Sequence, residues 1–232
     1  MSTQPIAFSF TIDNFVIWQT RSRHEDTDFV STTLQLKNAD GSLTPSQALS
    51  KAMGNVNNGT HVVNLTFPNV LVSPGQTVFW SYTIVNAGNA PPSKVTDGLE
   101  TVGNQLINLV LKAEIGGAAG SLLGIVGTIA GTVVGLIAGA LEGLLTANCD
   151  GPVAAEAISF TYDDLVANTN PTPPASRYLV ATNHPGINSP SGCGENSSYR
   201  VNWHVDQGPY TFWGGEPVAV TINRGGPPVH LR

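Results

Sequence analysis

Apolar and polar residues alternate in a series of short segments along the chain, and this period of two residues is typical of strands with one buried face. The alternating segments are 6–12, 30–36, 63–72, 78–84, 154–162, 199–205 and 218–222. Turn-forming sequences separate several of them, such as Asn57-Asn58-Gly59 and Ser73-Pro74-Gly75. Short alternating strands with frequent turns are typical of antiparallel sandwiches. We therefore expect a mainly β protein in which residues 1–92 and 149–232 form the two parts of one antiparallel β-sandwich.

A charged run at residues 20–28 lies between the first two alternating segments, and it predicts a hairpin with a charged tip. The carboxylates of Glu25, Asp26 and Asp28 offer oxygen atoms of the kind that bind calcium. However, the twelve-residue ligand spacing of a calcium loop, with its central glycine and terminal glutamate, is absent. We expect a solvated hairpin tip or an internal salt-bridge cluster rather than a metal site.

Two local signals modify the strand pattern. Thr44-Pro45 has the form of an N-cap followed by a proline at the first helical position, and Gly54 is typical of the end of a helix. A short helix is therefore predicted between them. Pro68 interrupts the alternating segment 63–72 and favours a bulged or edge strand, because proline cannot donate a ladder hydrogen bond. The chain is predicted to form loops from Asn168 to Ser176 and again after Val180, through Asn183 and Pro185, to Asn196.

Residues 93–112 change to a helical period. Ser93 is a good N-cap, and apolar residues recur at Val95, Leu99, Val102, Leu106, Leu109 and Val110 while polar residues occupy the other face. This pattern predicts an ordinary amphipathic helix. It opens a helical insertion at residues 93–148, between strands of the sandwich.

An uncharged segment follows from Ile115 to Leu141, about 27 residues long, where a membrane-spanning helix needs roughly 20. On a helix the glycines within this segment and just past it would form one stripe of small residues, at Gly120, Gly124, Gly127, Gly131, Gly135, Gly139 and Gly143. Such stripes occur where helices pack closely. Because each helical glycine costs about 1 kcal/mol relative to alanine, we expect a partner that packs against the stripe. Gly116-Gly117 would turn the chain into a glycine-zipper helical hairpin; one long helix is the alternative.

The composition narrows the functional classes. The chain has 232 residues, of which 41% are hydrophobic and 11% charged, whereas globular domains average about 25% charged. We associate a polar but uncharged surface with extracellular or toxin-like β-proteins. A net charge of −6 with scattered Lys and Arg gives no basis for nucleic-acid binding. The N-terminal sequence lacks the pattern of a Sec signal peptide, so we expect any secretion to use another route.

The two cysteines, Cys149 and Cys193, both lie in turn-like sequences. Their surroundings favour a disulfide that joins two loops in an oxidising compartment, with two free thiols as the alternative. The spacing does not suit zinc.

The ionisable residues form no recognisable catalytic or cofactor-binding motif. The five histidines fall in five separate segments, so surface or half-buried histidines are expected. No nucleophile elbow occurs. Asp163 and Asp164 are adjacent, and adjacent residues on a strand point to opposite faces. We therefore expect no enzyme, no cofactor and no metal ion; an enzyme acting through Asp163 or His204 is the least favoured hypothesis.

Aromatic residues gather near the C-terminus, where Tyr210, Phe212 and Trp213 lie among Gly and Pro. Such rings can anchor at a membrane interface or stack on a glycan, and the alternative is that Trp203 is core and Trp213 fills a loop.

Two functional hypotheses follow from these patterns. In the first, a water-soluble form self-associates and inserts the helical hairpin into a membrane, as a small pore-forming, toxin-like protein. In the second, the protein is a soluble structural or ligand-binding β-sandwich module whose glycine-rich helix is buried in a core or in an oligomer interface.

Overall fold

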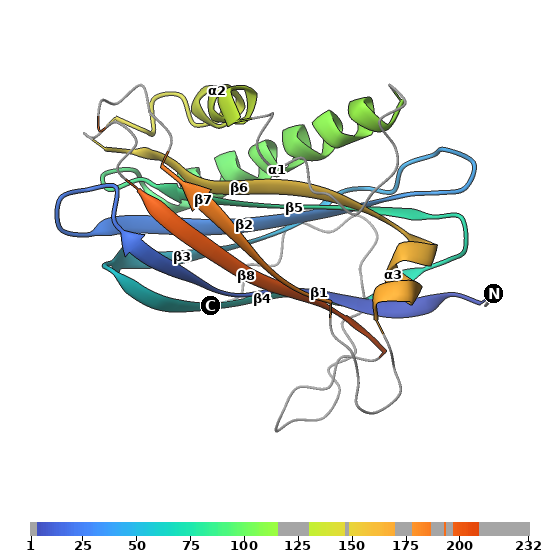
Figure 1. Ribbon diagram of the computed structural model, residues 1–232. Coiled ribbons are helices and arrows are strands. Elements are labelled where there is room, and N and C mark those ends of the chain that lie inside the picture. The colour runs from blue at the N-terminus through green and yellow to red at the C-terminus, as the bar shows by residue number, and fades with distance from the viewer. Residues whose placement is uncertain are drawn as a thin grey trace.

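The computed structural model describes residues 4–115, 130–146, 149–169, 178–186, 193 and 197–208, and the account that follows is confined to them. Within these ranges the chain forms eight strands and three helices (Figure 1). The strands are β1 (Ile6–Gln19), β2 (Asp26–Lys37), β3 (Gln47–Val56), β4 (Gly59–Val72), β5 (Thr77–Asn86), β6 (Gly151–Thr161), β7 (Tyr178–Pro185) and β8 (Ser198–Gln207). The helices are α1 (Pro92–Ile115), α2 (Ala130–Ala140) and α3 (Tyr162–Asn168).

The strands form two four-stranded sheets, and every pairing is antiparallel. Sheet 1 has the order β4-β1-β8-β7, and sheet 2 has the order β3-β2-β5-β6. The prediction of a mainly β protein with antiparallel sheets is therefore confirmed.

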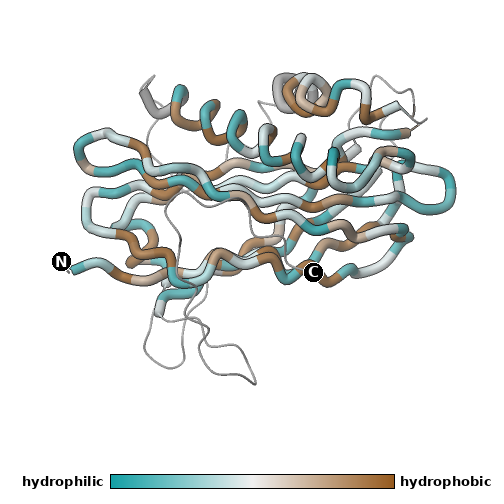
Figure 2. Tube along the Cα trace, turned by 180° about the vertical axis from the view of Figure 1, so that it is seen from behind, coloured by the Kyte–Doolittle hydropathy of each residue, from teal (hydrophilic) through white to brown (hydrophobic). Residues whose placement is uncertain are grey.

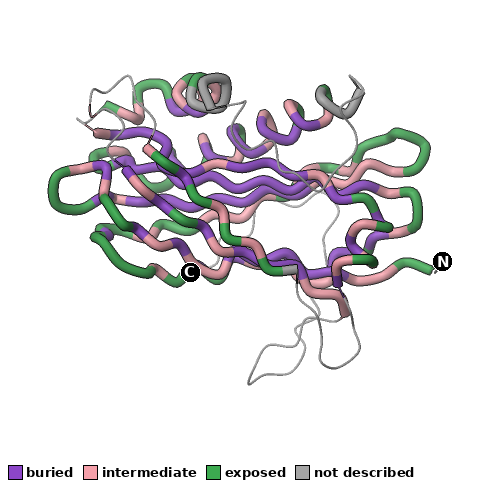
Figure 3. Tube along the Cα trace, viewed as in Figure 1, coloured by how far each residue is buried: buried purple, intermediate pink, exposed green. Residues whose placement is uncertain are grey.

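A single apolar core lies between the two sheets, which form stacked layers (Figure 1). The alternating residues of β1 and β8 enter it from one side and those of β5 from the other. Trp80 of sheet 2 meets Trp203 of sheet 1 edge to face, with ring centroids 4.9 Å apart. Tyr82 and Phe10 extend the same aromatic layer. Every residue of β5 is buried, because sheet 1 covers one face of the strand and α1 covers the other (Figure 3).

The predicted hairpin at residues 20–28 is wrong, because β1 and β2 lie in different sheets and the charged run crosses from one sheet to the other. Of the two alternatives for its charges, the internal one fits better: Arg21, Asp26 and Asp28 are all buried. Alternation identified both strands, but it carries no information about which strands pair.

The predicted helix between Thr44 and Gly54 is also wrong, because most of this segment belongs to β3. The Thr44 hydroxyl accepts a hydrogen bond from the Leu36 backbone N–H at 3.0 Å, so it serves the end of β2 rather than a helix. Gly54 has a φ of +71° and lies where the pairing of β3 with β2 shifts register. A glycine that permits a bulge was thus read as a helix end.

Pro68 lies on β4, an edge strand of sheet 1, as the sequence predicts. The pairing of β1 with β4 shifts register beside the proline, between Phe8 and Phe10. Asn69, in the left-handed conformation with a φ of +53°, occupies this bulge, and its N–H donates to the Ser9 hydroxyl.

Two elements were missed. Strand β7 contains Asn183, His184 and Pro185, which were read as loop residues. Helix α3 begins at a capping box, in which the Thr161 hydroxyl accepts from the Asp164 N–H and the Asp164 carboxylate accepts from the Thr161 N–H. Asp163 and Asp164 therefore lie on a helix and not on a strand.

Candidate functional site

Helices α1 and α2, with the turn that follows α2 to residue 146, lie together on the outer face of sheet 2 (Figure 1). We call them the helical unit. It connects β5 to β6, which pair with each other along their length. Asn86, at the end of β5, is opposite Gly151, at the start of β6, so the chain leaves the sheet and returns to it at adjacent positions.

Helix α1 covers sheet 2 with its apolar face, and this amphipathic helix is confirmed. Its buried side chains form a second core that is separate from the one between the sheets, and they are Val95, Leu99, Val102, Leu106, Ile107 and Val110. Phe29, Phe79 and Val85 meet them from the sheet, while Ile137 and Leu141 add contacts from α2 and its turn. Figure 2 shows the hydrophobic stretches of α1 on the side of the helix that faces the sheet. Each fully buried aliphatic side chain contributes about 1.5–3 kcal/mol to this docking.

Four hydroxyl side chains lie between the aromatic and aliphatic residues of this sheet face, and we call them the hydroxyl patch. In the register of β2 and β5, Ser31 is opposite Thr83 and Thr33 is opposite Ser81. All four are buried. Among the described residues, the hydroxyls of Ser31, Thr33 and Thr83 have no hydrogen-bond partner, and Ser81 reaches only the Gly103 carbonyl at 3.4 Å.

An unmade hydrogen bond of a buried hydroxyl costs about 1–3 kcal/mol relative to the hydrated group. The hydroxyl patch therefore subtracts from the stability that the apolar contacts of α1 provide. A sheet face covered permanently would gain stability from alanine or valine at these positions.

Helix α1 approaches its neighbours closely at two glycines that the sequence pattern did not single out. A Cβ atom at Gly103 would overlap the Thr33 side chain, and one at Gly98 would overlap the Leu141 side chain. Both glycines lie beside the apolar stripe of the amphipathic pattern. Their place beside the apolar residues is the feature of the sequence that could have indicated a close contact.

The predicted glycine stripe is only partly within the described residues. Gly120, Gly124 and Gly127 fall outside them, and Gly131 belongs to α2. Gly135 and Gly139 lie on the exposed side of α2, where a Cβ atom would have no neighbour within 4 Å. Gly143 follows α2 with a φ of +75° and also has open space. The glycine zipper as a contact between helices stays a prediction.

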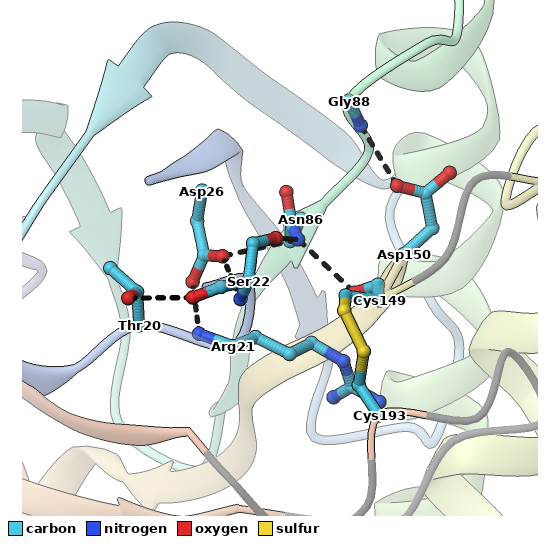
Figure 4. Close-up of a disulfide and its surroundings, with 9 residues drawn as sticks. All are labelled: Thr20, Arg21, Ser22, Asp26, Asn86, Gly88, Cys149, Asp150 and Cys193. Atoms are coloured by element: carbon cyan, nitrogen blue, oxygen red, sulfur yellow. Dashed lines mark hydrogen bonds between the residues drawn. A yellow bond between two sulfur atoms is a disulfide. The ribbon is translucent and has the colours of Figure 1, made fainter. Parts of the chain in front are cut away.

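The two chain segments that join the helical unit to sheet 2 are connected by hydrogen bonds, and we call this connection the neck (Figure 4). The Gly88 N–H donates to the Asp150 carboxylate at 2.9 Å, and the Asn86 side chain donates to the Cys149 carbonyl at 3.1 Å. The predicted disulfide between Cys149 and Cys193 is present. Cys149 has a φ of +76°, a left-handed conformation that costs a non-glycine residue roughly 1–2 kcal/mol.

Arg21 extends toward this disulfide from the crossing between the sheets (Figure 4). It is 2% exposed, and its Nη1 donates to the Pro152 carbonyl at 2.9 Å. Its Nε and Nη2 make no hydrogen bond in the described part of the chain. Burial lowers the pKa of Arg21, against the opposing negative charges of the Asp26 and Asp150 carboxylates.

Asp26, Asp28 and Tyr199 link the two sheets near Arg21. The Tyr199 hydroxyl lies 2.7 Å from Asp26 Oδ2 and 2.9 Å from Asp28 Oδ2. One phenol has one proton, so both short contacts are favourable only if one of the two carboxyl groups holds a second proton. Consistent with this, burial and the charge of Asp26 raise the pKa of Asp28 well above its ordinary value. Asp26 also accepts from the backbone N–H groups of Arg21 and Ser22 at 2.7 Å.

A second polar cluster joins β5 and β6 of sheet 2 to β7 of sheet 1. The Tyr82 hydroxyl donates to Glu156 at 2.6 Å and lies 2.8 Å from His184 Nε2. Thr182 donates to the same Glu156 oxygen at 3.0 Å. Burial lowers the pKa of His184 to about 4, so at pH 7 the ring is neutral and its Nε2–H can donate to the Tyr82 oxygen. Burial also raises the pKa of Glu156, although the hydrogen bonds from Tyr82 and Thr182 oppose this.

His204 lies between two carboxylates. Its Nδ1 is 2.8 Å from Asp13 and its Nε2 is 3.2 Å from Asp206. Burial disfavours the charged ring, but the hydrogen bonds and charges of Asp13 and Asp206 outweigh it and raise the pKa of His204 to about 9. His184 and His204 are both buried, so the prediction of surface or half-buried histidines is wrong for these two.

The other predicted site residues are not brought together. Tyr210, Phe212 and Trp213 lie outside the described residues, while Trp203 is in the core. No group of His, Cys, Asp and Glu suited to a metal ion occurs in the part of the chain that the structure describes. None of the helices in the described ranges combines the length and the apolar character needed to cross a membrane.

Comparison with known proteins adds no family to this description. No protein-family model matches the sequence, and no curated protein matches it either.

Proposed function

We propose that this is a small membrane-inserting, pore-forming protein whose helical unit leaves sheet 2 and enters a bilayer while the two sheets stay folded. The observation that carries the proposal is the hydroxyl patch beneath α1. Three of its hydroxyls are buried without a partner among the described residues. Departure of the helical unit would hydrate them, and this gain offsets part of the apolar surface that is exposed.

The uncovered sheet face would also tolerate water. It would present Ser31, Thr33, Ser81 and Thr83 at its centre, and its large apolar residues lie around them. The core between the two sheets does not include α1 or α2. The sheets would therefore keep their own core after the helical unit has left.

The helical unit would bring apolar surface to the bilayer. The buried face of α1, together with Ile137 and Leu141, would exchange contact with sheet 2 for contact with lipid. Helix α2 has 11 residues and a length of about 16 Å, whereas the hydrocarbon core is about 30 Å thick. Insertion as a span therefore requires a helix that runs through the uncharged segment 115–141 in the membrane.

Self-association would use the open side of α2. Gly135 and Gly139 are exposed and have no neighbour where a Cβ would be. Small residues four positions apart allow a second helix to approach closely, which is a common form of helix association in lipid. The expected partners are a second copy of the chain and a membrane.

The alternative function, a soluble structural or ligand-binding module, is favoured by one observation. Ile137 and Leu141 are fully buried against the core that α1 forms with sheet 2, as they would be in a helical unit that never moves. In that case the hydroxyl patch would lower the stability of the folded protein without serving any movement of the helical unit.

Dye release from liposomes separates the two functions when it is combined with two matched substitutions. Ser31→Ala removes a buried hydroxyl beneath α1, and Ser197→Ala removes one next to β8 in the other sheet; neither hydroxyl has a hydrogen-bond partner within the ranges that the structure describes. If docking of α1 gains about 1.4 kcal/mol, Ser31→Ala slows release about tenfold. Ser197→Ala leaves the rate unchanged.

Two results would count against the proposal. Absence of dye release by the wild-type protein at every pH and lipid composition tested would favour the soluble module. Equal slowing by Ser31→Ala and Ser197→Ala would show that overall stability, and not the docking of α1, controls release.

A further inference from the structure

The neck is the place where the chain enters and leaves the helical unit. One side of it leaves β5 at Asn86, and the other returns to β6 through Cys149 and Asp150. Two hydrogen bonds join the sides, from Gly88 to Asp150 and from Asn86 to Cys149. Both connect segments that belong to sheet 2.

The disulfide is the covalent connection from the neck to the opposite sheet. Cys193 precedes β8, a central strand of sheet 1, whereas Cys149 directly precedes β6 of sheet 2. Both cysteines are of intermediate exposure, so a small thiol reagent can reach them. Cys149 is also held in a left-handed conformation, with a φ of +76°, that its residue type disfavours. Cleavage of the bond would let this residue relax. Hydrogen bonds, such as those of Asn86 with Ser22 and of Arg21 with Pro152, would then hold the neck to the crossing between the sheets in place of a covalent bond.

Arg21 provides a second, independent observation at the same place. Its guanidinium lies beside the disulfide, almost completely buried, with Nε and Nη2 unpaired among the described residues (Figure 4). The charges of the Asp26 and Asp150 carboxylates already act on this guanidinium, but its Nε and Nη2 donate to no anion among the described residues. A disulfide sulfur offers almost no charge, but a thiolate would be a suitable partner at this position.

We propose that Cys149–Cys193 is a reducible latch that holds the helical unit in place, and that Arg21 stabilises the Cys193 thiolate formed when the latch opens. This inference rests on the proposed function, because it assigns the control of the same helical unit.

The reductant would be a dithiol. Its thiolate attacks Cys149 Sγ, the S–S bond breaks, and the electron pair of that bond leaves on Cys193 as a thiolate beside Arg21. The second thiol of the reductant then attacks the mixed disulfide, and Cys149 leaves with a proton. The reductant is oxidised to a disulfide by two electrons, and the protein gains those two electrons.

The first test concerns Arg21 alone and does not depend on membrane activity. The full-length protein is reduced with dithiothreitol, and the rate of alkylation of Cys193 by iodoacetamide is measured against pH by peptide mass spectrometry. The proposal predicts a midpoint below about 8.5, the ordinary thiol pKa, and a return toward that value in Arg21→Gln. Arg23→Gln changes an exposed neighbour and should have no effect.

Arg21→Lys is included because removal of a buried charge can impair folding. Lysine keeps the charge, so this variant should retain a lowered midpoint. If wild type, Arg21→Gln and Arg21→Lys all titrate with the same midpoint near that of a free thiol, the role of Arg21 is wrong.

The second test asks whether the disulfide controls the helical unit. Hydrogen exchange of the α1 amides is compared in the oxidised protein, the reduced protein and the Cys149→Ser/Cys193→Ser variant. The proposal predicts at least tenfold faster exchange in α1 after reduction and in the variant, with the exchange of β5 and β8 changed much less. Equal exchange of α1 in all three samples would overturn the latch.

Liposome dye release, measured in the same three samples, separates this inference from the proposed function. Faster exchange in α1 without any dye release would contradict membrane insertion and leave the latch standing. Dye release at the same rate in all three, with unchanged exchange in α1, would contradict the latch and leave the proposed function standing.

Discussion

The contact between Gly103 and Thr33 gives the most quantitative prediction about how the helical unit is docked. In the substitution Gly103→Ala, the new Cβ would lie 2.7 Å from the Cβ of Thr33. No rotation of the Thr33 side chain changes that separation, whereas carbon atoms in contact are normally about 3.5–4.0 Å apart. Helix α1 must therefore move away from sheet 2 by about 1 Å.

Overpacking of this kind costs about 1–3 kcal/mol, and a clash with a Cβ on a strand belongs at the upper end of the range. Alanine is about 1 kcal/mol more favourable than glycine within a helix. The expected net loss for Gly103→Ala is therefore about 2 kcal/mol. For a chain of this size, that loss corresponds to a fall in melting temperature of about 4–8 °C.

Gly135→Ala is the matched control, because the same substitution is made in a helix at a position with open space. Here only the helix propensity changes, so we expect a gain of up to about 1 kcal/mol. Thermal and urea unfolding of both variants measure the difference. If Gly103→Ala is as stable as Gly135→Ala, the close docking of α1 on the hydroxyl patch is wrong.

Four further predictions concern the polar clusters and the exposed side of α2. Because the pKa of His204 is raised to about 9 from 6.5, its contribution to stability is full below pH 6.5 and is lost as the pH rises to about 9, so His204→Gln should flatten urea midpoints measured over this range. Because the pKa of Asp28 is raised in the folded protein, ionisation of Asp28 lowers the free energy of unfolding as the pH rises, and Asp28→Asn should remove this loss of stability. Asp26→Asn should instead lose about 1.5–3 kcal/mol in the same urea titrations, because it weakens the hydrogen bonds that this carboxylate accepts. Gly135→Leu should fold as the wild type does but lose self-association and dye release, as measured by sedimentation and liposome leakage; unchanged assembly would exclude this face of α2 as an interface.

Hydrophobic periodicity predicted most of the strands and α1. A strand with one buried face has an apolar residue at every second position, and an amphipathic helix has one at every third or fourth position. Trp80 and Tyr82 on β5, and Val95 and Leu99 on α1, are examples. The disulfide was also predicted, since Cys149 and Cys193 are the only two cysteines.

The pairing of strands could not be predicted in the same way, because it depends on contacts between residues far apart in the sequence. Residues 20–28 have the composition of a hairpin tip, yet Asp26 and Asp28 are buried against Tyr199. The pairing of Tyr82 with His184 likewise requires β5 and β7 to meet. Gly103 could have been recognised as a contact only after Thr33 was known to lie opposite it.

The central claim, that the helical unit leaves sheet 2 at a membrane, is tested most directly by a thiol in the hydroxyl patch. Ser31→Cys places one beneath α1, at a position that is 2% exposed in the folded protein. Ser197→Cys places another at a position that is 3% exposed and next to β8 in the other sheet. Alkylation of each by a water-soluble maleimide is timed with and without liposomes that the wild-type protein permeabilises. The account predicts that liposomes accelerate the labelling of Ser31→Cys at least tenfold and leave Ser197→Cys unchanged; a Ser31→Cys thiol that stays equally protected while dye escapes would contradict it.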